Sequence, residues 1–140
     1  MSSPYESATL LVRLYELRRE DTMREARNWY AREFNPSTID DVMQALTGPH
    51  SGHLRMVTSY WDMAASFVLN GAIDEKMFND ANGEQVVAFA KIEPFLADYR
   101  NRMGNAGYLS SLETVVLRRA GAHEQLAGIR ERFRAMAGAR

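Results

Sequence analysis

The sequence contains no cysteine, and this absence removes several kinds of chemistry at once. Without a thiol there is no disulfide framework, no cysteine nucleophile and no thiolate ligand for a metal. No apolar run approaches the ~20 residues that a helix needs to cross a bilayer. The first six residues also lack the basic start and apolar stretch of a secretion signal. These absences favour a cytoplasmic protein that is held together by packing and has no membrane contact.

What the sequence does contain is the composition of an ordinary folded protein. Apolar residues make up 46% of the 140 positions and charged residues 25%, so one domain over residues 1–140 can bury a normal core. The net charge of −1 hides an asymmetry. Residues 33–98 carry ten acids and three bases, whereas residues 99–140 carry eight bases and three acids. Such halves can complement each other within one fold or between subunits, or the basic end can bind an acidic protein partner.

Helical periodicity runs through every long segment. The clearest stripe has apolar residues at steps of three and four and consists of Leu54, Val57, Trp61, Ala64 and Val68. A second apolar stripe on the same segment indicates a helix of about residues 53–70 that is contacted from two sides. No run of alternating residues bounded by turns predicts a strand. We therefore expect an all-α fold, an irregular bundle of six to seven helices around this central helix.

The first expected helix, about residues 3–19, is apolar around most of its circumference. Its apolar positions are Leu10, Leu11, Val12, Leu14 and Leu17. This coverage is wider than one core contact uses. Because two-fold dimers are the commonest way to cover such a surface, the sequence predicts a homodimer with this helix in or beside the interface.

Two residues mark breaks between later helices. Gly71 is a typical stop for the central helix, because glycine adopts a left-handed backbone without strain. Pro94 lies inside an otherwise continuous helical pattern. Proline lacks the amide that would bond to Ala90, so we expect a kink there and a free carbonyl at Ala90.

Motifs for metal binding are incomplete. With Gly83 at the sixth position of a calcium loop, Asp80 and Asn82 occupy the third and fifth. Phe78 and Phe89 then occupy the first and twelfth positions, where ligand oxygens are required. His50 and His53 flank a loop, which favours two solvated histidines over a metal pair. We expect no metal and no cofactor.

The sequence also lacks a nucleophile elbow, a phosphate loop and a dinucleotide-binding glycine motif, so it does not indicate an enzyme. An enzyme without a recognisable motif remains a third possibility. Nucleic acid is disfavoured as a partner by the pI near 6.3. In a helix-turn-helix alignment, Leu117 would also stand where a small residue is required.

Candidate contacts with a ligand or partner come from two regions. Asp62 lies between the two apolar stripes of the central helix, and Arg130 and Arg134 stack one turn apart in the basic last helix. Space around Trp61, Tyr99 and Pro94 could hold a ligand, and the eight methionines could make that core adaptable. The full set of candidates is Trp61, Asp62, Tyr99, Arg100, Arg130 and Arg134.

One segment resembles a family of bacterial helical domains of unknown function. In residues 60–75, YWDMAASFVLNGAIDE, a helix of apolar and small residues ends in glycine, and an aliphatic residue and Asp then open the next helix. Residues 92–100, IEPFLADYR, resemble the family's proline-containing helix that ends in arginine. The resemblance covers roughly residues 55–103. It implies a helical fold and no known activity or catalytic residue. Members often carry an N-terminal membrane helix, and this sequence shows no such run.

These observations lead to two functional hypotheses. The first is a non-enzymatic cytoplasmic interaction or regulatory protein that acts as a homodimer. The alternative is a helical binding module for a small apolar or acidic ligand.

Overall fold

The computed structural model describes residues 2–138, and within these residues the chain forms nine α-helices, one 3-10 turn and no strand. The elements are α1 (Pro4–Arg18), α2 (Asp21–Arg32), α3 (Ile39–Thr47), α4 (Ser51–Leu69), α5 (Glu75–Ala81), α6 (Glu84–Ile92), the 3-10 turn η1 (Glu93–Phe95), α7 (Leu96–Met103), α8 (Ser110–Leu117) and α9 (Ala122–Gly138). The predicted all-α class is confirmed. The expected count of six to seven helices was too low, because the helical pattern around Pro94 divides into two helices and the short segments α5 and α8 are separate helices.

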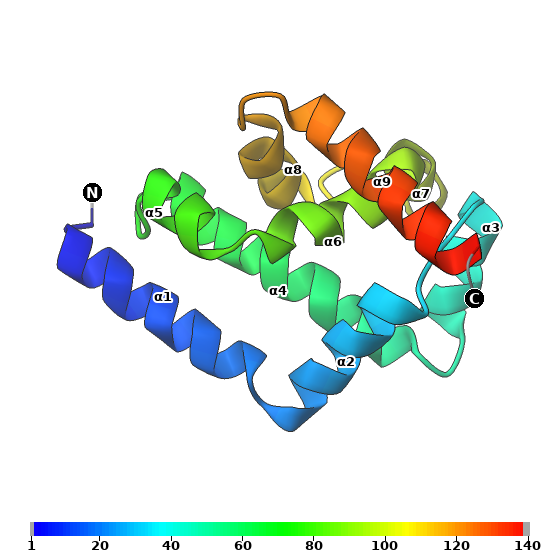
Figure 1. Ribbon diagram of the computed structural model, residues 1–140, viewed down its shortest axis with the longest axis horizontal. Helices are drawn as coiled ribbons and strands as arrows, with labels where there is room; N and C mark the ends of the chain where they lie inside the picture. Colours follow the sequence, from blue (N-terminus) through cyan, green and yellow to red (C-terminus); the bar gives the residue numbers. More distant parts are fainter. Residues whose placement is uncertain (1, 139–140) are drawn as a thin grey trace.

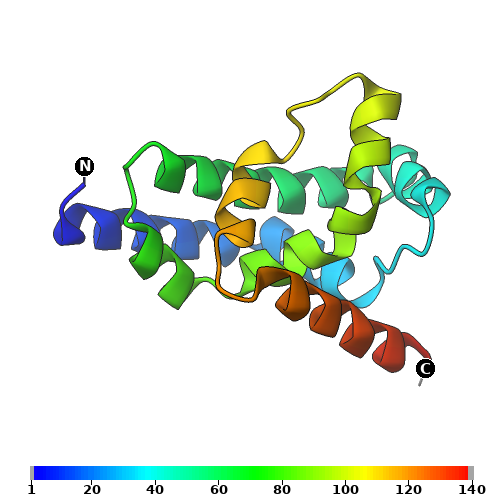
Figure 2. The same ribbon diagram turned by 90° about the horizontal axis from the view of Figure 1, so that it is seen from above.

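Helix α4 lies at the centre of the bundle. It packs against α2, α3, α5, α6 and α8 (Figure 1). All five residues of its predicted stripe are buried, and Trp61 and Ala64 have no exposed surface. Helix α1 runs antiparallel to α4, because the amide of Ser2 donates to the carbonyl of Gly71 while the Tyr60 hydroxyl donates to the carbonyl of Leu14. The two helices lie side by side in Figure 2.

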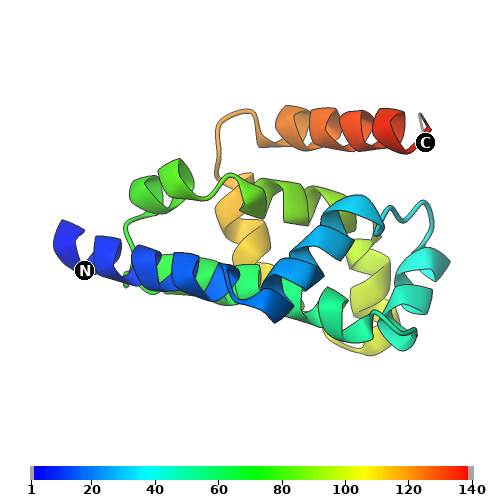
Figure 3. The ribbon, with the colours of Figure 1, turned by 60° about the horizontal axis from the view of Figure 1, so that its bottom comes forward.

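Helix α9 forms an outer layer over α6. In Figure 3 it lies on the opposite side of α6 from α1 and α4, and α6 contacts both α4 and α9. The buried apolar residues from α1 to α9 form one continuous cluster. A buried tyrosine joins α2 to α6, because the Tyr30 hydroxyl donates to the carbonyl of Ala88 in α6. Burial raises the pKa of Tyr60 to about 12 and raises that of Tyr30 further.

The two predicted breaks occur where the sequence places them. Gly71 follows α4 with a φ of +80°, which is the left-handed conformation expected of a glycine stop. At Pro94 the helical pattern is interrupted by the 3-10 turn η1 between α6 and α7. Within residues 2–138 no helix combines the length and the apolar character needed to cross a membrane.

Candidate binding surfaces

The six candidate contact residues do not form one site. Trp61 has no exposed surface and packs edge-on against Tyr60 in the core. The guanidinium of Arg18 lies 5.5 Å from the centroid of the Trp61 ring. Trp61 is therefore a core residue that no ligand reaches from solvent.

Asp62 caps a helix that lies fifty residues further along the chain. Its Oδ1 accepts a hydrogen bond of 3.0 Å from the backbone amide of Leu112, in the first turn of α8. Leu109, the residue at the cap position, has a left-handed backbone with φ 56° and no side-chain oxygen to offer. Because the amides of a first helical turn have no partner within the helix, Asp62 supplies the acceptor from α4.

Tyr99 and Arg100 hold the loop before α8. Arg100 donates two hydrogen bonds, of 2.9 and 2.7 Å, to the carbonyl of Tyr108 and a third, of 3.0 Å, to Glu113. The rings of Tyr99 and Tyr108 stack with centroids 4.3 Å apart. Asp62 and Tyr99 line a pocket of about 470 Å³ at this loop. The candidate residues Asp62, Tyr99 and Arg100 thus lie near one another, and their hydrogen bonds and ring stacking stabilise the fold.

Replacing Asp62 with alanine should therefore destabilise the protein. Loss of a capping acceptor costs about 1–2 kcal/mol of unfolding free energy. Asp62→Asn keeps an acceptor at the same place and should lose less than half as much. Urea denaturation measures both. Asp80→Ala is the control, because Asp80 is exposed and pairs only one turn away with Lys76, a contact worth about 0.5 kcal/mol or less. An Asp62→Ala loss no larger than that of the control would refute the capping role.

Arg130 binds the carbonyl that Pro94 leaves free. Its Nη1 donates to the carbonyl of Ala90 at 3.1 Å and to Oε1 of Glu93 at 3.0 Å. The sequence predicted the free carbonyl but not its partner, which lies in α9. Arg134, one turn further along, is exposed and pairs with Glu131 in its own helix.

Lys91 is a buried residue whose ammonium group binds the end of α2, a contact that was not predicted from the sequence. It is 6% exposed, and its Nζ donates to the carbonyls of Tyr30, Ala31 and Phe34 at 2.7–2.9 Å. These carbonyls lie at the end of α2, where the helix provides no amide partners. The ammonium also lies 4.1 Å from the centroid of the Phe133 ring. The signal available in the sequence was a single charge within the apolar run of α6, in a chain with only two lysines.

A second pocket of about 610 Å³ opens beside Lys91, between the loop after α2, the Pro94 turn and α9. Pro94, Arg130 and Arg134 line it, whereas Tyr99 lines the pocket at α8. The single space expected around Trp61, Tyr99 and Pro94 is therefore divided into a core position and two separate pockets.

The acidic and basic parts of the chain pair with each other within the protomer. Among the described residues, four ion pairs join residues 33–98 to residues 99–140, namely Arg102–Asp40 at 3.5 Å, Arg102–Asp98 at 3.3 Å, Arg118–Glu75 at 3.0 Å and Arg130–Glu93 at 3.0 Å. The acidic and basic parts of the sequence thus form ion pairs with each other within one protomer.

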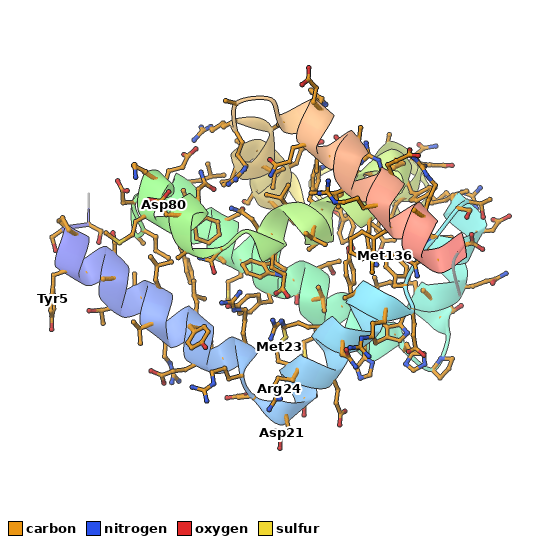
Figure 4. The ribbon with its side chains drawn as sticks, viewed as in Figure 1. Tyr5, Asp21, Met23, Arg24, Asp80 and Met136 are labelled. Carbon is orange, nitrogen blue, oxygen red and sulfur yellow. The ribbon has the colours of Figure 1, made fainter. Side chains whose placement is uncertain are left out.

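Helix α1 carries an exposed apolar face. Tyr5 is 81% exposed, Val12 57% and Tyr15 52%, and Ala8 on the same face is also exposed. The Tyr5 side chain points away from the rest of the protein (Figure 4). Leu14 is buried, so the opposite face of the helix packs on the protomer's own core.

Of the residues at the incomplete metal motifs, the two phenylalanines lie in the apolar core and the two histidines in an aromatic stack. Phe78 and Phe89 are both fully buried. His50 and His53 stack on each other at 5.5 Å, and His50 stacks on Trp29 at 5.3 Å. Over the part of the chain that the structure describes, no three His, Asp or Glu side chains come close enough to hold a metal ion.

The fold and its surfaces define an all-helical protein. Its charged residues Asp62, Lys91 and Arg130 bind backbone groups at helix ends and at the Pro94 turn. The chain belongs to the family described as Domain of unknown function (DUF4760), which matches residues 5–119. The resemblance seen over residues 55–103 is thereby confirmed over a longer range, and α9 lies beyond the matched residues. No curated protein and no solved structure matches the chain.

Proposed function

We propose that the protein is a non-enzymatic cytoplasmic interaction protein that acts as a homodimer, with α1 as the dimer interface. The observation that carries this proposal is the exposed apolar face of α1, which comprises Tyr5, Ala8, Val12 and Tyr15 and is called the α1 face below. Exposed apolar residues that occur singly need no explanation, but a contiguous stripe is typical of an interaction surface.

The spacing of the α1 face suits pairing with another helix. Its residues follow one another at steps of three, four and three, which is the spacing of a coiled-coil seam. The same helix packs on its own protomer through the opposite side, where Leu14 is buried. A helix with two opposed apolar sides is stable in water when both are covered. A second copy of the chain brings an identical face, so pairing covers the outward face of α1 in both copies at once.

An antiparallel arrangement fits this face better than a parallel one. Arg19 follows Tyr15 at the next seam position, so parallel pairing would set the two Arg19 side chains against each other. Antiparallel pairing separates them and places Tyr5 against the partner's Tyr15 and Ala8 against the partner's Val12.

Cross-linking tests both the face and the orientation. The chain contains no cysteine, so Tyr5→Cys and Tyr15→Cys each introduce a single thiol. We expect mild oxidation to link the two variants when they are mixed, with one of them tagged so that the mixed dimer separates by size. Each variant alone should link poorly.

The matched control is Arg13→Cys, which places the thiol on the exposed polar edge of the same helix. Efficient linking of Tyr5→Cys with itself would contradict the antiparallel orientation. Linking of the mixture at the level of the Arg13→Cys control would contradict the interface itself.

A further inference from the structure

The pocket between α9 and the Pro94 turn has an apolar wall. The side chains that form it are Pro36, Pro94, Phe95, Ile129, Phe133 and Ala137. Its volume of about 610 Å³ is within the range of small-molecule sites, roughly 300–1,000 Å³. Two prolines and a 3-10 turn contribute to the wall, so much of it is rigid before any ligand arrives.

The charged residues that line this pocket are all cationic. They are Lys91, Arg130 and Arg134, and among the described residues that line it there is no carboxylate. Lys91 and Arg130 are fixed by the backbone carbonyls that they bind. Arg134 is 71% exposed and its ion pair with Glu131 lies on the surface. Such a pair contributes little, so the guanidinium can turn towards a bound anion at small cost.

We infer that this pocket binds a small amphipathic carboxylate, a molecule with an apolar body and one carboxylate group. The apolar wall accepts the body, and Arg134, together with the free donors of Arg130, receives the head group through charge-assisted hydrogen bonds. An inorganic anion would leave the apolar wall exposed to water. A cationic amphiphile would find no carboxylate among the described residues that line the pocket. This inference is independent of the dimer, because the pocket and the α1 face come from different helices.

Decanoate, kept below its micelle concentration, is a suitable probe for calorimetric titration. We expect one binding site per chain and weaker binding of octanoate by about tenfold, because two methylene groups are lost. Decan-1-ol should bind more weakly than decanoate, and decyltrimethylammonium should not compete with it.

Two variants identify the site. Arg134→Gln should weaken decanoate binding about threefold to tenfold, and Ala137→Trp should abolish it by filling the pocket from the exposed side of α9. Arg132→Gln is the matched control, because Arg132 is exposed on the same helix and does not line the pocket. Equal affinity for decanoate and decyltrimethylammonium, or binding that survives Ala137→Trp, would overturn the inference.

Discussion

Replacing Lys91 with methionine should lower the unfolding free energy by about 3–5 kcal/mol, since three carbonyls at the end of α2 would lose their buried donor. Methionine retains most of the apolar stem, so the loss reports on the ammonium group and not on a cavity. For a chain of this length the melting temperature should fall by about 10–15 °C. Calorimetry or circular dichroism measures the change.

The other lysine of the chain provides the control. Lys76 is exposed and pairs only with Asp80 in its own helix, so Lys76→Met should change stability by about 0.5 kcal/mol or less. Lys91→Arg keeps the charge but not the compact ammonium, and should give an intermediate loss. If Lys91→Met melts within about two degrees of the wild type, Lys91 does not cap α2.

The second large effect is a contrast between two neighbouring positions of α1. Leu14→Glu should unfold the protomer, because Leu14 is 4% exposed and a buried unpaired carboxylate costs several kcal/mol. Val12→Glu should leave the protomer folded, because Val12 is 57% exposed. In the dimer, however, the new carboxylate would lie in the seam, and its desolvation should weaken association by at least about a hundredfold.

Arg13→Glu is the matched control for this contrast. It introduces the same side chain at the residue between the two, on the polar edge of α1, and should alter neither folding nor association. Circular dichroism reports the folding of each variant, and light scattering reports its mass. A Val12→Glu protein that remains dimeric would place the interface elsewhere.

The main features of the fold could be predicted because they depend on local periodicity. The stripe on α4, the glycine stop at Gly71 and the break at Pro94 all follow from residues that are neighbours in sequence. Proline removes an amide in any helix, so even the free carbonyl of Ala90 was accessible to this reasoning.

Contacts between distant segments could not be predicted in this way. The cap that Asp62 provides for α8 and the bonds from Lys91 to the end of α2 join positions about fifty to sixty residues apart. Nothing in the local pattern of either segment specifies such a partner. The left-handed backbone of Leu109, whose side chain is buried, was likewise not predicted from the sequence.

The sequence indicated that α1 has more apolar surface than one contact needs, but not which side packs on the protomer. The sequence favoured Leu10 or Leu14 as the position that faces a partner. In the structure Leu14 is buried and Leu10 packs partly buried against the core, so the outward face begins at Tyr5 and runs through Val12.

Sedimentation of the wild-type protein across about a hundredfold concentration range at micromolar protein tests the homodimer most directly. We expect the mass to rise from 15.9 kDa towards twice that value as concentration increases, and the Val12→Glu variant to stay at the monomer mass throughout. A wild-type protein that sediments as a monomer over the whole range would contradict the proposed function.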